Sequence, residues 1–222
     1  MILARVLCLV GGYIFGLLQT SYIYGRLNGI DIREHGSGNA GTTNALRVLG
    51  KKAGLIVFLG DFCKAIAATV IARIVMGHIY PDEMYLYIAY AGIGAVLGHN
   101  FPCYLKFRGG KGIAATAGII VGFLDPVIML SCLVVFVAVV ALTRYVSLGS
   151  IIMVTVFATE YTIFAMNGKY SFNMDDTSSW YAMIESVIVV VVLAAMAIYR
   201  HRANIKRLIN HEENKLGSKK TA

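Results

Sequence analysis

The sequence predicts an all-α integral membrane protein, a polytopic bundle of about seven transmembrane helices, and two observations carry this prediction. Hydrophobic residues make up 58% of the 222 residues and charged residues only 14%, whereas soluble domains carry about 25% charged residues. The apolar residues also gather in runs, several of which approach the ~20 residues with which a helix crosses a bilayer. We therefore expect a single membrane-embedded domain over residues 1–222, with a short basic tail over residues 200–222.

Apolar segments recur along the whole chain. In order they cover Ile2–Tyr24, Ala53–Gly77, Met84–Gly98, Gly112–Leu124, Pro126–Thr143, Val146–Met166 and Trp180–Tyr199. The first has the position of a signal peptide, but no small-residue cleavage pattern follows it, so we expect a retained span. The fourth is short for a full span, and the sequence leaves open whether it crosses the membrane, tilts or forms a half-helix.

Basic residues predict the orientation of the bundle. Most of the 20 lysines and arginines fall in alternate loops and in the tail, including Lys219 and Lys220, which puts them on one side of the predicted bundle. Such loops face the cytoplasm. The opposite loops carry acids instead: Asp82, Glu83, Asp125, Asp175 and Asp176. We therefore predict an outer N-terminus and a cytoplasmic C-terminus, against which only Arg5 and Arg73 run weakly.

The net charge and the cysteines restrict the classes of partner. A formal net charge of +8 would suggest nucleic acid in a soluble chain. In a membrane protein it indicates cytoplasmic loop charge and affinity for anionic lipids or substrates. The four cysteines are scattered and show no metal-binding or redox spacing. We expect no metal site, no cofactor and no nucleic-acid partner.

Three polar stretches would meet on the cytoplasmic face. Residues 36–47 are small, polar and rich in glycine, and successive N–H groups in such a loop suit an anion. Arg47 adds a guanidinium that can grip a phosphate. In residues 99–112 a glycine pair and Lys111 lead into a helix start, which is also typical of a phosphate site. An ordinary positive-inside turn remains the alternative for this second stretch. The third stretch, residues 201–213, continues from the last span, where basic residues commonly act as a topology anchor.

These stretches resemble the motifs of a known family. The chain reads GSGNAGTTNALRVLGKKAG over 36–54, GHNFPCYLKFRGGKGIA over 98–114 and HRANIKRL over 201–208. In this order they resemble the three motifs of the bacterial acyl-phosphate:glycerol-3-phosphate acyltransferases, the PlsY family. The resemblance implies transfer of a fatty acyl group from acyl phosphate to glycerol 3-phosphate, giving lysophosphatidic acid in phospholipid biosynthesis. It also implies a location in the bacterial cytoplasmic membrane, a site facing the cytoplasm, and functional coupling to the enzyme that makes acyl phosphate.

The resemblance implies two sets of site residues. In a catalytic set, Ser37, Arg47, Lys111, His201 and Asn204 would hold glycerol 3-phosphate and the developing charge. Glu213, the sixth member, would orient a basic partner or bind a glycerol hydroxyl. A substrate-binding set would cradle the acyl phosphate and support the loops: Gly38, Asn39, Asn44, His99, Asn100, Lys106, Gly109, Gly110 and Gly112. His211 stands where the family tail commonly has glycine, which leaves Glu212 as the alternative to Glu213.

Several alternatives stay open on the sequence alone. Asp61 and Lys64 lie three residues apart in an apolar segment, and either pair with each other or line the floor of the site. The proton of the glycerol hydroxyl passes either to a histidine or to a substrate phosphate oxygen, and the family resemblance favours the latter. The leading alternative function is a transporter for an organic phosphate, since transporters use short, glycine-interrupted helices. The acyl-chain preference and the oligomeric state are not encoded in these patterns.

Overall fold

The structure, a computed structural model, describes residues 1–170 and 172–217, and all its regular elements in that part of the chain are helical. Lys219 and Lys220, which contribute to the charge asymmetry, lie outside the described residues. The α-helices are α1 (Ile2–Gly16), α2 (Thr20–Leu27), α3 (Thr42–Ile79), α4 (Met84–Asn100), α5 (Ile113–Gly122), α6 (Pro126–Thr143), α7 (Val146–Met166), α8 (Thr177–Arg200) and α9 (Arg202–Ile209). Three short 3₁₀ helices connect them: η1 (Ile32–Glu34), η2 (Pro81–Glu83) and η3 (Cys103–Leu105). The all-α prediction is confirmed for these residues.

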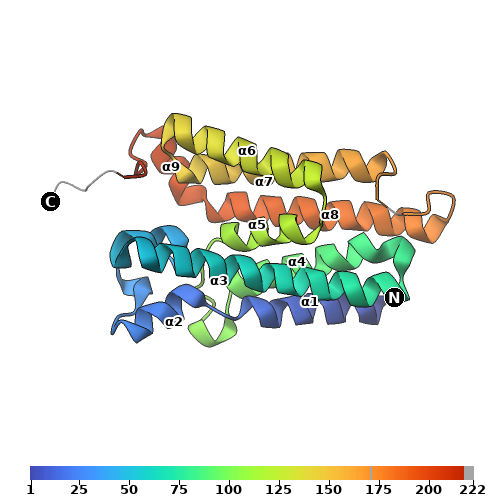
Figure 1. Ribbon diagram of the computed structural model, residues 1–222, viewed down its shortest axis with the longest axis horizontal. Coiled ribbons are helices and arrows are strands. Elements are labelled where there is room, and N and C mark those ends of the chain that lie inside the picture. Colours follow the sequence, from blue (N-terminus) through green and yellow to red (C-terminus); the bar gives the residue numbers. More distant parts are fainter. Residues whose placement is uncertain (171, 218–222) are drawn as a thin grey trace.

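The long helices run side by side, and their connections alternate between two ends of the bundle (Figure 1). The N-terminus shares one end with η2 and the α7–α8 connection. The other end holds α2, the loop before α3, the loop after α4, and α9. The three polar stretches singled out in the sequence therefore meet at one end.

Small residues allow α1 and α4 to pack closely. A Cβ atom added at Gly12 would overlap the carbonyl oxygen of Ala91, and one added at Gly98 would overlap that of Tyr13. Close backbone approach through glycine is the usual way for helices to associate in a membrane, where apolar burial supplies little driving force. This contact brings the end of α4, which carries His99 and Asn100, against the end of α1 and Gln19.

Five helical stretches are long and apolar enough to cross a membrane. They are Ile2–Leu27, Thr42–Ile79, Pro126–Thr143, Val146–Met166 and Thr177–Arg200. The other two expected segments are helical but shorter, with 17 residues in α4 and 10 in α5. The membrane bundle is thus confirmed, while the number of seven spans and the orientation stay predictions.

Two elements differ in detail from the expectation. The first apolar run is not one helix, because the chain breaks between α1 and α2, where the Gln19 amide donates to the carbonyl oxygens of Gly16 (3.2 Å) and His99 (3.0 Å). The stretch expected as a loop over residues 36–47 is helical from Thr42 onward. A kink at Gly50, with φ of 87°, separates this first part of α3 from its membrane part. Arg47 therefore projects from a short helical segment of its own.

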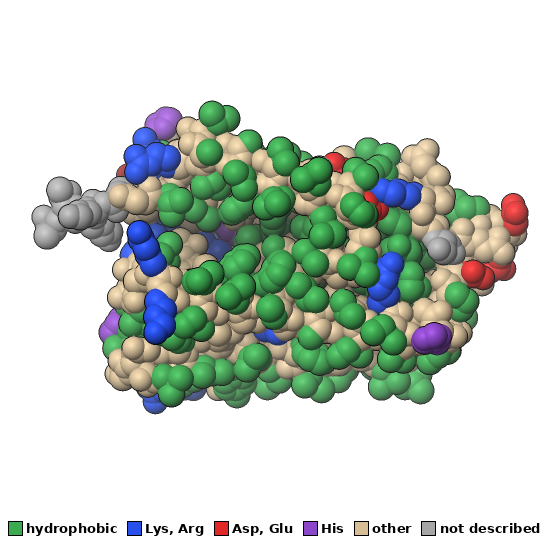
Figure 2. All heavy atoms as spheres, in the orientation of Figure 1, with side chains coloured by type: hydrophobic (Ala, Val, Ile, Leu, Met, Phe, Trp, Pro, Cys, Tyr) green, Lys and Arg blue, Asp and Glu red, His purple; other side chains and the backbone are tan. Residues whose placement is uncertain are grey.

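Charged side chains are distributed unevenly between the two ends of the bundle. Figure 2 shows several Lys and Arg side chains at the end that carries α9, whereas most of the visible acidic side chains lie on the opposite half, together with two groups of basic side chains. At that opposite end, Glu185 accepts two hydrogen bonds from Arg5 (2.7 and 2.6 Å). Glu160 accepts from Ser131 (2.5 Å). Both glutamates thus make contacts between helices.

Candidate active site

Asn44 holds the glycine-rich loop in shape. Its side-chain oxygen accepts from the Ser37 N–H (2.8 Å), and its amide donates to the carbonyl oxygens of Ile32 (3.1 Å) and His35 (2.9 Å). A Cβ at Gly36 would overlap this amide oxygen, and Gly36 has φ of 63°. Asn44 is buried and its amide is committed to the loop backbone, so it acts here by fixing the position of Ser37.

The second glycine stretch folds back on the end of α4. The N–H of Gly109 donates to the Asn100 carbonyl oxygen and that of Gly110 to the His99 carbonyl oxygen, each at 3.1 Å. Side chains at these glycines would overlap the α4 backbone or the His99 ring. Gly112, with φ of 82°, turns the chain into α5. The two N–H groups expected to cradle a phosphate are thus occupied by carbonyl oxygens, and the glycines serve close packing.

Arg200, at the end of α8, completes this loop. Its guanidinium donates to the carbonyl oxygens of Gly110 (2.6 Å) and Gly109 (3.3 Å), and lies 5.2 Å from the centre of the Phe101 ring. Sequence reasoning counted Arg200 only as a basic residue of the tail. Its position directly before His201 was the available signal, but its partners are backbone atoms some 90 residues away, which no local pattern reveals.

Lys111 joins the third stretch through a chain of polar contacts. Its ammonium donates to the Asn204 side-chain oxygen, and the Asn204 amide donates to Glu213 (2.7 Å). Arg207 forms an ion pair with the same carboxylate (2.7 Å), and the Ser147 hydroxyl donates to it (3.0 Å). The Glu213 side chain is only 7% exposed. We call these five residues the Lys111–Glu213 network.

The network separates the two tail glutamates. Glu213 accepts from three side chains, whereas Glu212 is exposed on the surface. α9 has a buried and an exposed face, since Asn204 is buried while Arg202 and Lys206 are exposed. Ser147, from α7, is a member that the sequence reasoning missed, because it belongs to none of the three motifs.

The surroundings of Lys111 weaken its hold on a proton. Burial, together with nearby Arg207, Arg200 and Arg47, lowers the pKa of Lys111 from 10.5 to about 8, against the opposing effect of Glu213. Like charges repel, so binding of an anion among these basic groups stabilises the protonated form of Lys111. This arrangement suits a phosphate-bearing ligand.

One of the two ring nitrogens of His201 is hydrogen-bonded to the backbone of its own helix. This nitrogen, Nδ1, donates to the carbonyl oxygen of Ala197 one helical turn earlier (2.8 Å), which assigns the proton to Nδ1 and leaves Nε2 as an acceptor. Burial lowers the pKa of His201 to about 4, with Lys111 and Arg200 adding to the shift. The ring is therefore neutral at physiological pH and can accept a hydrogen bond from a hydroxyl group.

Arg47 and Ser37 are exposed at this end of the bundle. Among the residues that the structure describes, the Arg47 guanidinium makes no hydrogen bond or ion pair, although it is close enough to depress the pKa of Lys111. An arginine without a protein partner beside a second cation is available to an anionic ligand.

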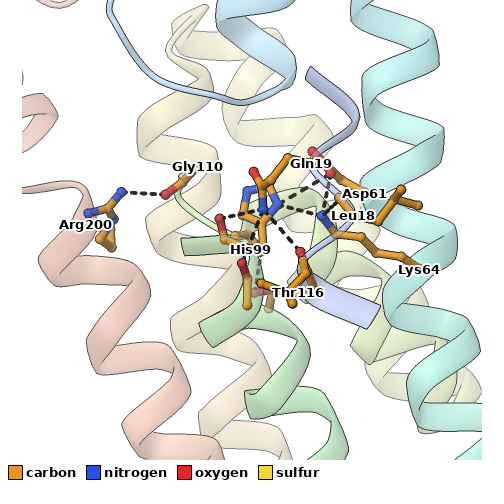
Figure 3. A network of polar contacts seen from close by, with 12 residues as sticks. Leu18, Gln19, Asp61, Lys64, His99, Gly110, Thr116 and Arg200 are labelled. Atoms are coloured by element: carbon orange, nitrogen blue, oxygen red, sulfur yellow. Dashed lines mark hydrogen bonds and ion pairs between the residues drawn. The ribbon is translucent and has the colours of Figure 1, made fainter. Parts of the chain in front are cut away.

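A buried polar cluster lies beneath the glycine loops (Figure 3). The Lys64 ammonium donates to Asp61 (2.8 Å) and to the carbonyl oxygen of Leu18 (2.6 Å), and lies 3.0 Å from Nδ1 of His99. Both alternatives for Asp61 and Lys64 hold in part, because they pair with each other and also contact His99. His99 in turn touches Gly110, so the cluster forms the floor under the loop.

Lys106 and Gly38 contribute to a separate cavity of about 360 Å³ beside α2. Its lining also includes Arg33, which donates to Asp31 (2.7 Å) and to the carbonyl oxygen of Leu105 (3.2 Å). This places Lys106 apart from the Lys111–Glu213 network. Within residues 1–170 and 172–217 there is no group of three or more His, Cys, Asp or Glu that could hold a metal ion.

Comparisons with known proteins agree on one family. A family profile described as "Glycerol-3-phosphate acyltransferase" matches residues 6–211. A glycerol-3-phosphate acyltransferase of Clostridioides difficile is 42% identical, with 99% of this chain and 98% of the relative aligned. One of Bacillus subtilis is 41% identical over 95% of this chain and 96% of the relative.

A solved structure has the same overall fold. The crystal structure of PlsY (YgiH), an integral membrane glycerol 3-phosphate acyltransferase, in its glycerol 3-phosphate form superposes with a TM-score of 0.78. It shares 30% sequence identity over 96% of both chains. The lysophosphatidic acid form of PlsY gives a TM-score of 0.75 at 29% identity.

Proposed function

This chain belongs to the glycerol-3-phosphate acyltransferase family, and on that premise we propose that it takes its acyl group from an acyl phosphate. The group passes to the 1-hydroxyl of glycerol 3-phosphate, and the products are lysophosphatidic acid and inorganic phosphate. One observation carries the proposal for this site: Arg47 is unpaired among the described residues and contributes to the lowered pKa of Lys111, which the Asn204–Glu213 contacts hold in place. Two cations held close together suit a reaction between two phosphate-bearing substrates.

The candidate residues supply different chemical groups to the proposed reaction. Arg47 and Lys111 supply positive charge for phosphate oxygens, and Ser37 supplies a hydroxyl on a loop that Asn44 keeps rigid. Lys111 and Gly112 add N–H groups at the start of α5, where the helix dipole favours an anion. Glu213 orients Asn204 and Arg207 and does not need to touch substrate.

The chemistry requires position and charge stabilisation more than a protein nucleophile. The hydroxyl oxygen of glycerol 3-phosphate attacks the acyl carbon, and the bond from that carbon to the phosphate oxygen breaks. The phosphate leaves as an anion that the basic groups stabilise. An acyl phosphate is a mixed anhydride with a good leaving group, so holding the two substrates together supplies much of the rate enhancement.

The hydroxyl proton passes to an oxygen of the departing phosphate in this proposal. His201, whose pKa is lowered to about 4, is too weak a base to keep the proton. Its Nε2 accepts a hydrogen bond from the hydroxyl and so orients the oxygen for attack. This favours the second of the two proton acceptors that the sequence left open.

The acyl chain has a place between the helices in the same proposal. Figure 2 shows a hollow between α3 and the group α6–α8, with hydrophobic walls and with basic and histidine side chains toward the polar end. A fatty acyl chain lying there would reach the site from the bilayer. The proposal also includes seven membrane segments, an outer N-terminus, and a site on the cytoplasmic face of the bacterial membrane. The single domain over residues 1–222 and coupling to the enzyme that makes acyl phosphate belong to it as well.

The donor is tested with purified protein in lipid vesicles. Palmitoyl phosphate and glycerol 3-phosphate should give lysophosphatidic acid and phosphate in equal amounts, whereas acyl-CoA and acyl carrier protein should give none. Product from acyl-CoA alone would overturn the donor assignment. Uptake of labelled glycerol 3-phosphate into sealed vesicles without any donor would instead support the transporter alternative.

A further inference from the structure

The segment after α9 lies along the turn between α6 and α7. Two residues of the turn and one at the start of α7 face three of the tail in antiparallel order: Arg144 with Leu216, Tyr145 with Lys215, and Ser147 with Glu213. The sequence offered no reason for these segments to meet, and the turn holds none of the expected site residues. The pairing nevertheless ends at Glu213, the centre of the Lys111–Glu213 network.

Arg144 provides the strongest link. Its carbonyl oxygen accepts from the Leu216 N–H (2.7 Å). Its guanidinium donates back to the Leu216 carbonyl oxygen through Nη2 (2.8 Å) and Nε (3.2 Å). Both backbone groups of Leu216 are therefore held by one residue. A side chain with a forked guanidinium makes such a contact, and alanine cannot.

The tail needs such a support. α9 ends at Ile209, and the residues after it form turns and irregular backbone. Fixing an irregular segment costs about 1–2 kcal/mol per residue in backbone entropy. The backbone N–H groups of His211 and Glu212 bond back to the last turn of α9, at Leu208 and Arg207. Beyond Glu213, the hydrogen bonds that hold Leu216 come from Arg144.

We propose that the α6–α7 turn is a positioning element of the acyltransferase site, a latch in which Arg144 and Ser147 hold Glu213 against Asn204. This inference rests on the proposed function. Held there, Glu213 keeps Asn204 directed at Lys111. Neither Arg144 nor Ser147 touches substrate. The α6–α7 hairpin, which carries no motif, thus contributes to the site from outside.

Arg144→Ala should lower kcat/KM for glycerol 3-phosphate about tenfold, the size expected for losing one or two hydrogen bonds to a charged group. The loss should appear mainly in KM, because Lys111 is still present but less well directed. Arg144→Lys should recover part of it, since an ammonium still reaches the Leu216 carbonyl oxygen. Lys206→Ala is the matched control, a basic residue of the same tail that is exposed, and it should leave both constants unchanged.

A double-mutant cycle shows whether Arg144 acts through Glu213. Glu213→Gln should itself reduce kcat/KM, and adding Arg144→Ala to it should cost little more. A full additional tenfold loss in that background would overturn the latch and indicate a general structural role for Arg144. Unchanged kinetics of Arg144→Ala beside an active wild type would overturn it equally.

Hydrogen exchange tests the latch without reference to turnover. The Leu216 amide should be protected in the wild type and exchange much faster in Arg144→Ala, while amides in α8 stay protected. Equal exchange in the two proteins would contradict the latch even if the donor assignment holds. Faster exchange together with no acyl transfer by the wild type would leave the latch standing and place the failure in the proposed reaction.

Discussion

The two ends of the bundle differ in how their charged side chains are paired. At the end that carries the N-terminus, two ion pairs join separate elements: Arg5 pairs with Glu185 at 2.6 Å, and Lys169 pairs with Asp125 at 2.8 Å. At the other end, cations stand beside cations. Arg47 has no hydrogen-bond or ion-pair partner among the described residues and adds to the repulsion that acts on Lys111.

In the proposed function, this difference separates charges that hold helices together from charges that are available to bind a ligand. A paired, partly buried charge recovers its lost hydration from its partner. A group of unpaired cations costs stability, and proteins keep such groups mainly at functional sites. The basic end still contains one carboxylate of this network, Glu213, and it serves to hold Asn204 and Arg207 in place.

The largest expected effect follows from removing the unpaired arginine. Arg47→Ala should reduce kcat/KM by at least about 10²-fold, as loss of one charged group that stabilises a transition state usually does. Thermal unfolding should stay unchanged, because the guanidinium makes no hydrogen bond or ion pair within the described chain. Acyl transfer from palmitoyl phosphate and a thermal melt of the same preparation measure the two quantities.

Lys52→Ala is the matched control for this variant. Lys52 is an exposed cation five residues further along α3, beyond the kink at Gly50. It should leave activity and melting unaffected. Near-normal turnover of Arg47→Ala would mean that the basic end does not bind substrate phosphate through this residue. The difference in charge pairing between the two ends would then not be explained by substrate binding.

The bundle and the three polar stretches could be predicted from the sequence because local signals specify them. Apolar run length marks the helices, and lysine and arginine in alternate loops put Arg47, Lys111 and His201 at one end. The contacts made by Arg200 and Ser147 could not be predicted, since their partners lie some 90 and 66 residues away. The break between α1 and α2 was also not predicted, although Gln19, Thr20 and Ser21 interrupt the apolar run there, because apolar residues continue on both sides of these three.

The occupied N–H groups of Gly109 and Gly110 are a second example of contacts between distant segments that the sequence does not predict. A glycine pair before a helix suggests free donors for a phosphate, and this local pattern is correct about the backbone shape. It cannot reveal that the end of α4 supplies carbonyl oxygens to the same donors. Which N–H donors remain free depends on how segments pack against one another, and this packing cannot be predicted from the sequence of a single segment.

A smaller effect is expected from titrating Lys111. Its pKa is lowered to about 8, so the free enzyme loses this cation as the pH rises through that value. The protonated form binds the phosphate, and kcat/KM should therefore fall above pH 8 by up to about tenfold per pH unit. The charge of glycerol 3-phosphate does not interfere, since its second phosphate pKa is about 6.

Lys111→Arg identifies the group responsible for this alkaline limb. A guanidinium stays charged across the range, so kcat/KM should be lower than in the wild type but flat up to higher pH. The same limb at the same pH in Lys111→Arg would assign the titration to another group. Lys51→Arg, on an exposed lysine of α3, should leave the profile as it is.

The smallest effect on activity is expected at the opposite end. Glu185 accepts from Arg5 and, at 2.6 Å, from the Tyr90 hydroxyl, so it ties α1, α4 and α8 together. Glu185→Gln keeps the size of the side chain but removes the charge, which should lower the free energy of unfolding by about 1–3 kcal/mol. Turnover should remain at the wild-type level at temperatures where the protein is folded. A variant that unfolds normally but loses turnover would give the end that carries the N-terminus a part in the reaction. The division between paired charges and charges available to a ligand would then no longer hold.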